Sequence, residues 1–509
     1  MFRVRLKQYC SRLGVSTVNY SLLLPVAVPI VFLLAVSSGW SREIHILHYN
    51  DFHVNNSPRY TVDEDGDGYY RGGAANLKGL VDSLRTVYSY DLLVNTGDDF
   101  QGSPISGFTR GGSQVAILNA MGVEFFCPGN HEFDYGDLNL LEQLAPASFY
   151  TICCNVTDDQ GRLYWPAYHI IELGGLRLGI IGVITAGLPE LVVKENLEHS
   201  RVLEPVEEIR RWLRQLEDET DLQLLLSHSG YRTDSLYAVT LPGIDAIIGG
   251  HSHTELPQGR WIGNTLVVQA GCCGNWLGDL LITIDDTTGA VTLTDWLHEV
   301  GVGQVTPAAD MQLTVKQLAD QLPAELSEVI GQLAQPWLRE RGESNVGDWT
   351  ADVMRTYAAT DLGFMNLGGL RRNLPAGEIT RLDIWEVHPF GNHYVTFEMT
   401  GQELLMFLQR VARDELNESF AFSGMEFSIH QELGVVSRIL IDGESLILNR
   451  SYTAVTNNFI FSHLEEIFTL DPALVNARHL PELDRDVIIQ AVREQQTVTA
   501  VNHNRITFY

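Results

Sequence analysis

Five short segments of the chain carry side chains that could hold metal ions, and each segment follows a run of apolar residues. The side chains are carboxylates, imidazoles and one carboxamide, with no thiol among them. The candidate ligands are Asp51, His53, Asp98, Asn130, His228, His251 and His253. Oxygen and nitrogen donors of this kind suit Zn, Mn, Fe or Co. The pattern therefore predicts a metal centre, and the identity of the metal stays open.

The spacing within these segments favours more than one ion. Asp51 and His53 are two residues apart, as are His251 and His253, so on extended backbone each pair would point to one side. Asp98 directly follows an apolar run, where its two carboxylate oxygens could bridge two ions. Two ions about 3.5–4 Å apart can clamp a phosphoryl group and activate a water molecule. We therefore expect two divalent metal ions and phosphoester chemistry.

The apolar runs before the candidate ligands are predicted strands that bring them together. They span residues 44–47, 91–94, 123–126, 222–226 and 244–248. Functional groups in an open α/β sheet gather at the carboxyl ends of its strands. Helical spacing at 72–85 and 206–216 predicts helices that cover both faces of a mixed sheet. Each candidate ligand then lies just beyond a strand, at a common edge.

Length and charge narrow the functional classes. A chain of 509 residues is too long for one ordinary core, so two domains are expected. The formal net charge of −30 argues against nucleic acid as a partner, because phosphate-backbone contacts need clustered Lys and Arg. A small phosphorylated substrate is compatible with this charge, since bound metal ions can invert the local field.

The N-terminal residues have the pattern of a targeting segment. Arg3, Arg5 and Lys7 precede an apolar run at 22–36, which is shorter than the roughly 20 residues of a membrane span. Small residues at 35–37 could form a cleavage site. We predict a signal peptide over residues 1–37, with an uncleaved anchor as the alternative. The mature protein would be exported, periplasmic or secreted, without stable membrane insertion.

The cysteines do not form a recognisable disulfide framework. Five remain after residue 37, four of them in two adjacent pairs, and their spacing is not regular: Cys127, Cys153, Cys154, Cys272 and Cys273. All of them lie in or beside segments that read as core. The expected role is that of small buried hydrophobic residues, with a single bridge between the pairs as the alternative.

A change of composition separates the second half of the chain. Residues 306–333 are rich in Ala, Gln and Leu and are predicted to form a helical linker. Ser344 is a plausible N-cap for an amphipathic helix, and strand-like runs follow it. The predicted domains are therefore 42–305 and 334–509.

Four motifs in the first half resemble the metallophosphoesterases of the 5′-nucleotidase group, which includes UDP-sugar hydrolases. They span residues 47–53, 95–103, 129–136 and 249–253, and the resemblance extends from about residue 43 to the C-terminus. It implies an α/β (α+β) architecture with two parts. A four-layer metallophosphoesterase β-sandwich flanked by helices would be followed by a smaller α/β substrate-binding domain.

The resemblance also implies a role for each candidate ligand. The ligands that it implies are Asp51, His53 and His253 for one ion, Asn130, His228 and His251 for the other, and Asp98 as the bridge. His131 matches the catalytic histidine of the group, and Asp134 matches the acid that orients it. A histidine three residues before an aspartate could also be held protonated by it, ready to stabilise charge on a phosphoryl group.

In the second half, the resemblance points to substrate contacts. Asn366 and Arg371 would contact the substrate, and a guanidinium is well suited to a phosphate. Phe390 and Phe459 would stack on either side of a base. Glu465 stands near the position of an acid that binds ribose hydroxyls in the group.

Two departures from the group pattern put ribose recognition in doubt. Leu367 stands where the group has the first of three glycines, and 461–466 replaces a Gly-Gly-Asp segment.

We therefore expect an exported dinuclear phosphohydrolase that releases phosphate from nucleotides by attack of a metal-bound hydroxide. The alternatives are a 2′,3′-cyclic-nucleotide phosphodiesterase, a phosphoesterase for a non-nucleotide ester, or a sulfur-ester hydrolase. A binding protein with a vestigial site is disfavoured, because no candidate ligand has been lost.

Overall fold

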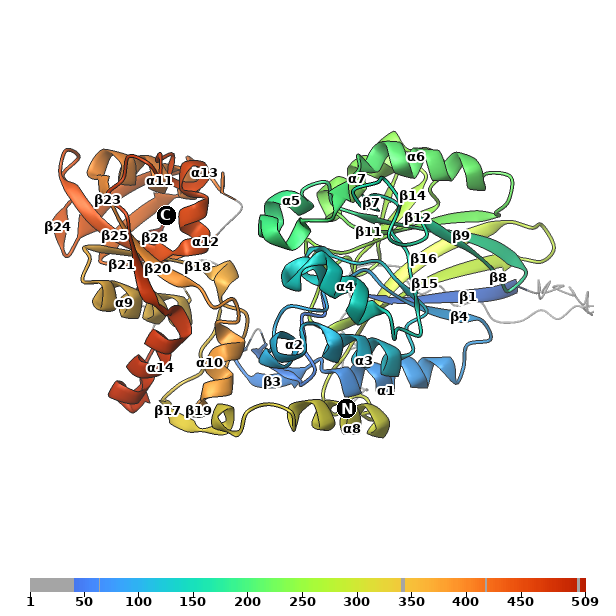
Figure 1. Ribbon diagram of the computed structural model, residues 1–509, viewed down its shortest axis with the longest axis horizontal. Helices are drawn as coiled ribbons and strands as arrows, with labels where there is room; N and C mark the ends of the chain where they lie inside the picture. The colour runs from blue at the N-terminus through green and yellow to red at the C-terminus, as the bar shows by residue number, and fades with distance from the viewer. Residues whose placement is uncertain (1–40, 64, 340–343, 417–418, 501–503) are drawn as a thin grey trace, which may run out of the picture. The chain divides into compact units, whose positions relative to one another are not determined.

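The first half of the chain is built on two six-stranded sheets (Figure 1). The computed structural model describes residues 41–63, 65–339, 344–416, 419–500 and 504–509. The first sheet has the order β16 (Val291–Glu299), β15 (Trp276–Asp285), β1 (Ser41–Tyr49), β4 (Asp91–Asn95), β5 (Phe125–Phe126), β6 (Tyr150–Thr151). The second has the order β13 (Arg260–Ile262), β14 (Thr265–Val268), β12 (Ala246–Gly249), β11 (Leu222–His228), β9 (Leu176–Ile184), β8 (Tyr168–Leu173). All five predicted strands are present.

Alternating apolar residues pack the two sheets face to face. Ile44 and Ile46 of β1 belong to the same buried cluster as Leu224 and Leu226 of β11. Leu47 points to the opposite face of β1 and joins a different cluster. Side chains on a strand alternate between its two faces, so one strand can serve two cores. The fully buried Leu or Ile side chains each contribute about 1.5–3 kcal/mol.

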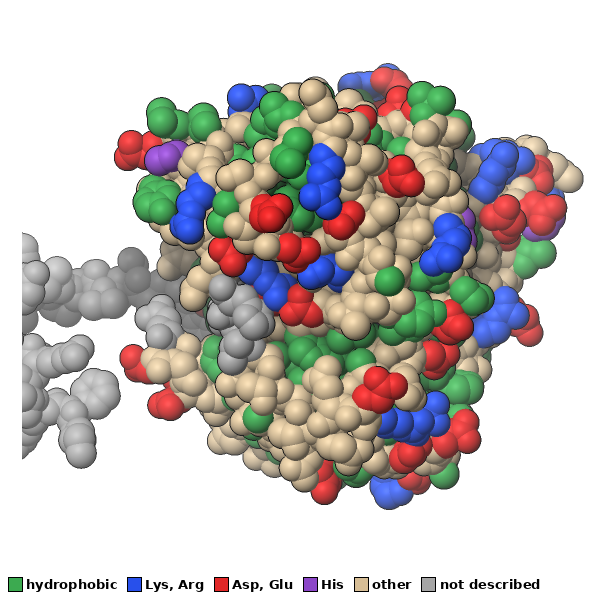
Figure 2. Space-filling view, turned by 90° about the vertical axis from the view of Figure 1, so that its left-hand side faces the viewer, with side chains coloured by type: hydrophobic (Ala, Val, Ile, Leu, Met, Phe, Trp, Pro, Cys, Tyr) green, Lys and Arg blue, Asp and Glu red, His purple; other side chains and the backbone are tan. Residues whose placement is uncertain are grey.

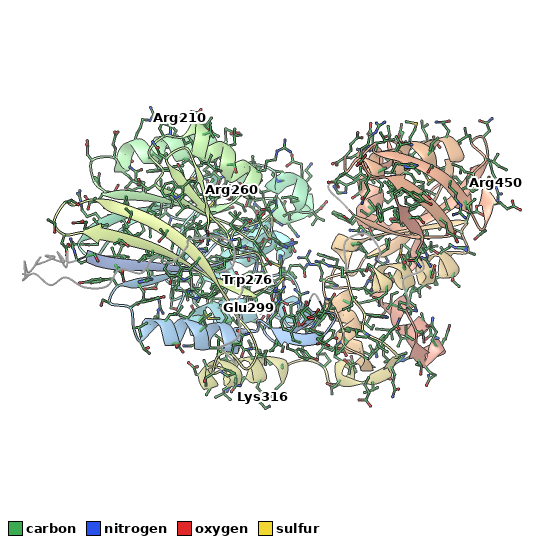
Figure 3. The ribbon with its side chains drawn as sticks, turned by 180° about the vertical axis from the view of Figure 1, so that it is seen from behind. Arg210, Arg260, Trp276, Glu299, Lys316 and Arg450 are labelled. Carbon is green, nitrogen blue, oxygen red and sulfur yellow. The ribbon has the colours of Figure 1, made fainter. Side chains whose placement is uncertain are left out.

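Helices cover the outer faces and complete four layers. The first sheet is covered by α1 (Ala74–Arg85), α3 (Gly112–Met121), α4 (Asp137–Leu144) and α8 (Ala309–Ala319). The second is covered by α6 (Pro205–Leu216) and α7 (Tyr231–Thr240). In α6, Ile209, Leu213 and Leu216 are buried, whereas Arg210 is directed away from the core (Figure 3). Proline at the first turn of α6 suits its missing N–H. The expected four-layer architecture is confirmed.

The second half contains a five-stranded sheet with two smaller ones. The order of the larger sheet is β21 (Phe420–Ser423), β18 (Leu362–Asn366), β25 (Ser451–Asn457), β20 (His393–Thr400), β26 (Arg478–Leu483). The smaller sheets are β19 (Gly377–Thr380), β17 (Val329–Leu333), β27 (Thr497–Val498), and β24 (Glu444–Ser445), β23 (Val435–Ile441), β22 (Met425–His430), β28 (Ile506–Phe508). The helices are α9 (Asn345–Ala358), α10 (Arg381–Val387), α11 (Gly401–Ala412), α12 (Asn458–Ser462), α13 (Leu464–Phe468) and α14 (Asp484–Gln495). This is the expected smaller α/β part.

The start of the second half shows one agreement and one difference. The Ser344 side chain accepts a hydrogen bond from the Gly347 N–H at 3.1 Å, so it caps α9 as predicted. The predicted linker at 306–333 is helical in α8, but its last residues form β17. This strand pairs with β19 and β27, and its apolar residues Ile330 and Leu333 join the core of the second half.

The described surface is mixed in charge where Figure 2 shows it. Lys and Arg side chains lie among Asp and Glu side chains on that face, without a continuous basic stripe among the side chains drawn there. Within the described part of the chain, no helix is both long and apolar enough to cross a membrane. The predicted signal peptide at 1–37 lies outside the described residues.

Candidate active site

The candidate ligands leave the carboxyl ends of strands from both sheets of the first half. Asp51 and His53 follow β1, Asp98 follows β4, and Asn130 opens a short 3-10 helix (Asn130–Tyr135) after β5. His228 is the last residue of β11, and the remaining pair, at 251 and 253, follows β12. β1, β4 and β5 are parallel, as are β9, β11 and β12. The ligands therefore gather where the two sheets present the same end, rather than on a single open sheet.

One group of donors combines a carboxylate with two imidazoles. Asp51, His53 and His253 each place a ligand atom within 4.8 Å of the others. The Nε2 atoms of the two histidines are 3.0 Å apart, and Nε2 of His253 is 3.3 Å from Asp51 Oδ1. Nδ1 of His53 lies 3.2 Å from the carbonyl of Gln101. Donation of that N–H leaves a lone pair on Nε2, as metal binding requires.

A second group lies beside the first. Asp98, His228 and His251 also lie within 4.8 Å of one another. Nε2 of His228 is 3.2 Å from Asp98 Oδ2 and 3.3 Å from Asn130 Oδ1, which is 2.9 Å from Nδ1 of His251. His228 Nδ1 lies 2.5 Å from the carbonyl of Thr96, and donation to this carbonyl directs its Nε2 toward Asp98 and Asn130. Both groups therefore suit divalent ions by number, type and orientation of donors.

The backbone of the ligand loops is left-handed rather than extended. Asp51, His53, Asp98, His251 and His253 have φ between 50° and 74°. Non-glycine residues seldom adopt such angles, and the strain is tolerated where function requires a particular orientation. The expectation that the two-residue spacing acts through extended backbone is therefore wrong. The side chains converge because each loop turns sharply after its strand.

A glycine makes the close approach of two segments possible. A Cβ atom on Gly129 would lie 2.3 Å from Asp98 Oδ1 and 2.6 Å from His228 Cε1. Any larger residue would push apart the loops that carry these two donors. This explains the glycine before Asn130 in the third motif.

His131 and Asp134 form the pair that the sequence predicts. His131 Nδ1 is 2.7 Å from Asp134 Oδ2, and the His131 backbone N–H donates to Asp98 Oδ1 at 2.9 Å. Burial lowers the pKa of His131, but the charges of Asp134 and Asp98 outweigh it and raise the pKa to about 9. In this environment the imidazole holds a proton at neutral pH.

The charge of the proposed bridging carboxylate is also favoured by its neighbours. Burial raises the pKa of Asp98, but His228 and His131 hold it well below its usual value. The pKa of His228 is raised to about 10 by Asp98, against the effect of burial. Such mutual stabilisation in a buried place is typical of sites that bind charged ligands.

Glu132 organises the site, although sequence reasoning gave it no role. It is completely buried, and its carboxylate accepts hydrogen bonds from the backbone N–H groups of Gly129, Asp98, Asp99 and Phe100. The distances are 2.6–3.2 Å. Its position directly after His131, in the motif at 129–136, is the sequence feature that could have indicated this role. Glu132 ties the loop after β4 to the loop after β5.

The predicted substrate residues share one cavity with the candidate metal ligands. The cavity has a volume of about 340 Å³ and lies within the single compact unit of residues 41–509. Its wall contains His53, Asp98, Asn130, His131, Asp134, His251 and His253 from the first half, and Asn366, Arg371, Phe390 and Phe459 from the second. The Arg371 guanidinium is 5.7 Å from the Phe390 ring centre, which is 6.5 Å from that of His131.

Glu465 is the predicted substrate residue that the structure does not bring to this cavity. It is exposed on α13 and is absent from the cavity wall. Leu464, its neighbour, is buried in the core and fixes the orientation of the helix. Two residues that sequence reasoning missed, Leu191 and Asn392, do line the cavity.

Comparisons with known proteins agree with this geometry. Residues 44–255 match the calcineurin-like phosphoesterase family, and residues 329–471 match the 5′-nucleotidase C-terminal domain. Among solved structures, the 5′-nucleotidase precursor from Thermus thermophilus superposes with a TM-score of 0.79 and 26% identity. That superposition covers 92% of this chain and 99% of the other.

Two curated relatives show the range of proteins that share these domains. The 5′-nucleotidase of Vibrio cholerae serotype O1 is 25% identical over 477 residues, which cover 82% of this chain and 84% of that protein. Endonuclease YhcR of Bacillus subtilis is 26% identical over 454 residues, which cover 82% of this chain but 37% of that protein. The chain thus spans little more than a third of this second relative.

Proposed function

Because the chain belongs to the 5′-nucleotidase family and is a metal-dependent phosphoester hydrolase, we propose that it releases phosphate from nucleotides at a dinuclear metal site. The first half would supply the metal centre and the second half the nucleotide contacts. We further propose that the protein is exported, with residues 1–37 acting as its signal peptide.

The observation that carries this proposal is the shared cavity. Candidate metal ligands form one part of its wall, and two phenylalanines with an arginine form another. A phosphate held near Asp98 would lie in the same space as a base held near Phe390. Aromatic faces stack on any base and are worth roughly 1–3 kcal/mol each.

Two divalent ions would be held by the two groups of donors described above, with Asp98 between them. When bound, such ions polarise phosphoryl oxygens and activate water. The chain's own contribution is to orient these donors through Gln101, Thr96 and Glu132, which accept hydrogen bonds at fixed positions. Pre-organised ligands hold a metal more tightly and in a defined geometry.

His131 and Arg371 would act on the phosphoryl group itself. Asp134 holds the Nδ1–H of His131, which leaves its Nε2–H to donate to a phosphoryl or leaving-group oxygen. The Arg371 guanidinium, on the wall of the same cavity, can bind a phosphate through two N–H groups. Together they would place two positive charges where negative charge develops.

A second candidate is a phosphoesterase for a non-nucleotide ester or a cyclic nucleotide. It is favoured by the position of Glu465, which lies outside the cavity and leaves no predicted acid for ribose hydroxyls there. In that case the metal centre would act as proposed, and only the substrate preference would differ.

Phosphate release with added Mn or Zn tests the proposal. The panel holds AMP, UDP-glucose, 2′,3′-cyclic AMP and glycerol phosphate, with Asp98→Asn as the inactive control. A clear preference for AMP or UDP-glucose would support a nucleotide substrate. Preference for the cyclic nucleotide or equal rates on all four would overturn that part, and absence of metal-dependent release would overturn the whole. Mass spectrometry of the exported N-terminus tests cleavage near residue 37.

A further inference from the structure

The five described cysteines fall into two groups with different surroundings. Cys127, Cys153 and Cys154 are completely buried, and burial raises the pKa of each thiol, to about 11 for Cys153. Cys272 is partly exposed, which differs from the expected core position, and its side chain shares a hydrogen bond with that of Cys273. This hydrogen bond, together with burial, raises the pKa of Cys272, and the same hydrogen bond lowers the pKa of Cys273. A thiol must be accessible to react with a reagent, so access distinguishes Cys272 from the other four described cysteines, which are buried.

Cys272 and Cys273 line a narrow, positively charged cavity beside the metal ligands. His53 and His253 form part of its wall. The other ionisable residues on the wall are Arg59, Arg339, Arg371, Arg372 and Glu386. Four guanidinium groups thus face a single carboxylate, in a chain whose net charge is −30.

Among the described residues of the cavity wall, most of this positive charge has no carboxylate partner. Arg339 donates to the carbonyl of Leu370 at 2.8 Å, and Arg59 donates to the carbonyl of Arg371. Arg372 pairs with Glu386 and also donates to the carbonyl of Pro58 at 3.2 Å. Carbonyl oxygens orient guanidinium groups without neutralising them. The cavity therefore attracts anions, whose local concentration it raises.

We propose that Cys272 is a modification site for small anionic disulfides, which the arginine cavity attracts, and that the mixed disulfide inhibits the enzyme. Glutathione disulfide has the required chemistry, because it is small, anionic and contains an exchangeable S–S bond. This regulation goes beyond the proposed substrate and does not depend on it.

The chemistry is a thiol–disulfide exchange. Cys272 loses its proton to solvent, and its thiolate attacks one sulfur of the disulfide. A new bond forms between Cys272 Sγ and that sulfur as the original S–S bond breaks. The other half leaves as a thiolate with the electron pair, so the disulfide itself is the oxidant. An added thiol reverses the exchange.

Two structural features couple the modification to hydrolysis. The cavity measures about 40 Å³, which is room for a few water molecules at most, since each needs roughly 10–15 Å³ of such space. A group attached to Cys272 does not fit within it and must displace residues of its wall, which includes His53 and His253. In addition, the Cys273 N–H donates to the carbonyl of Asp51 at 2.7 Å, so displacement of this turn moves a candidate ligand segment.

Labelling kinetics on the native full chain test the proposal. The probes are dianionic dithiobis(nitrobenzoate) and neutral 2-hydroxyethyl disulfide, with each rate divided by the rate for the unfolded chain. Peptide mass spectrometry should find the label on Cys272, with the anionic reagent favoured about tenfold at low salt and the preference lost at high salt. Hydrolysis of p-nitrophenyl phosphate should fall with labelling and return with dithiothreitol. Equal normalised rates, or labelling without inhibition, would overturn the proposal.

Two variants distinguish the effect of the Cys272 thiol from the effect of the arginine side chains of the cavity. Cys272→Ser should keep its turnover and lose the inhibition, whereas the matched buried control Cys153→Ser should be inhibited as the wild type is. Arg59→Gln should slow labelling by the anionic reagent about threefold or more and leave the neutral reagent unaffected. Persistent inhibition of Cys272→Ser would show that another group is responsible. If that variant does not fold, the wild-type peptide map still decides which thiol reacts.

Discussion

The metal half and the substrate half of the cavity are built in different ways. Every candidate metal ligand lies within a few residues of the end of a buried strand in the first half. The proposed substrate contacts come from the end of β18, from the loop before β20 and from α12, which are separate elements of the second half. A site on strand ends tolerates little change, because the sheets fix its geometry. A site on loops and short helices can change its residues without loss of the fold.

The two sides also differ in how individual side chains are held. On the metal side, Glu132 alone accepts hydrogen bonds from four backbone N–H groups of two loops. On the substrate side, Phe459 is 44% exposed and touches the His463 ring from the same helical segment. The comparison predicts that the departures at Leu367 and 461–466 change the substrate preference and leave the chemistry of the metal half unchanged.

The largest effect should come from the proposed bridging ligand. Asp98→Ala removes the carboxylate that is proposed to bridge the two ions, so metal content and turnover should fall together, with kcat/KM lower by about a thousandfold or more. Elemental analysis beside phosphate release measures both. The exposed acid Asp65 provides the control variant, Asp65→Ala. Retention of two ions by Asp98→Ala would contradict the bridging role.

Replacement of His131 should separate metal binding from rate. His131→Ala leaves every proposed ligand in place but removes the proton donor, so kcat should fall about 10²- to 10⁴-fold while metal content stays. Asp134→Asn should show a smaller loss, because it affects only the orientation and charge of the imidazole. Loss of metal from His131→Ala would mean that this histidine is a ligand instead.

Glu132→Gln tests whether the hydrogen bonds between loops maintain the metal half. A neutral carboxamide accepts these N–H groups less strongly and brings its own donor, so metal affinity should fall about 10- to 100-fold. Titration of the metal-free protein with Mn measures this change. An unchanged affinity would show that the strands alone position the ligands.

Phe390→Ala tests whether the second half recognises the base of a nucleotide. KM for AMP should rise about tenfold, and KM for p-nitrophenyl phosphate should change less, because only AMP has a base to stack. Glu465→Ala is the matched comparison and should leave both values unchanged, since its side chain lies outside the cavity. A rise in KM for Glu465→Ala would show that α13 reaches the substrate.

The smallest effect is expected where the second half begins. Ser344→Ala removes the side chain that caps α9, so the free energy of unfolding should fall by about 1 kcal/mol. Turnover by the folded fraction should not change, which thermal denaturation beside kinetics can establish. A large loss of activity would mean that the start of α9 also affects the geometry of the metal centre in the first half.

By itself, the sequence determined the strands, the residues at their carboxyl ends, the His131–Asp134 pair and the cap of α9. These features depend on residues close together in the chain, where alternation and motif spacing carry the information. Proximity of the donors that follow strands of the same sheet also followed from the sequence, because parallel strand ends meet at one edge, whereas the packing of the two sheets brings the two sets of donors together.

Tertiary structure alone decided the features that join distant segments. The left-handed turns at the ligands, the position of Glu132 among four N–H groups, and the exclusion of Glu465 from the cavity arise from packing between elements. The same holds for Cys272, whose arginine neighbours come from residues 59, 339, 371 and 372. No local pattern encodes these contacts, because each depends on how two segments far apart in the sequence fill a shared space.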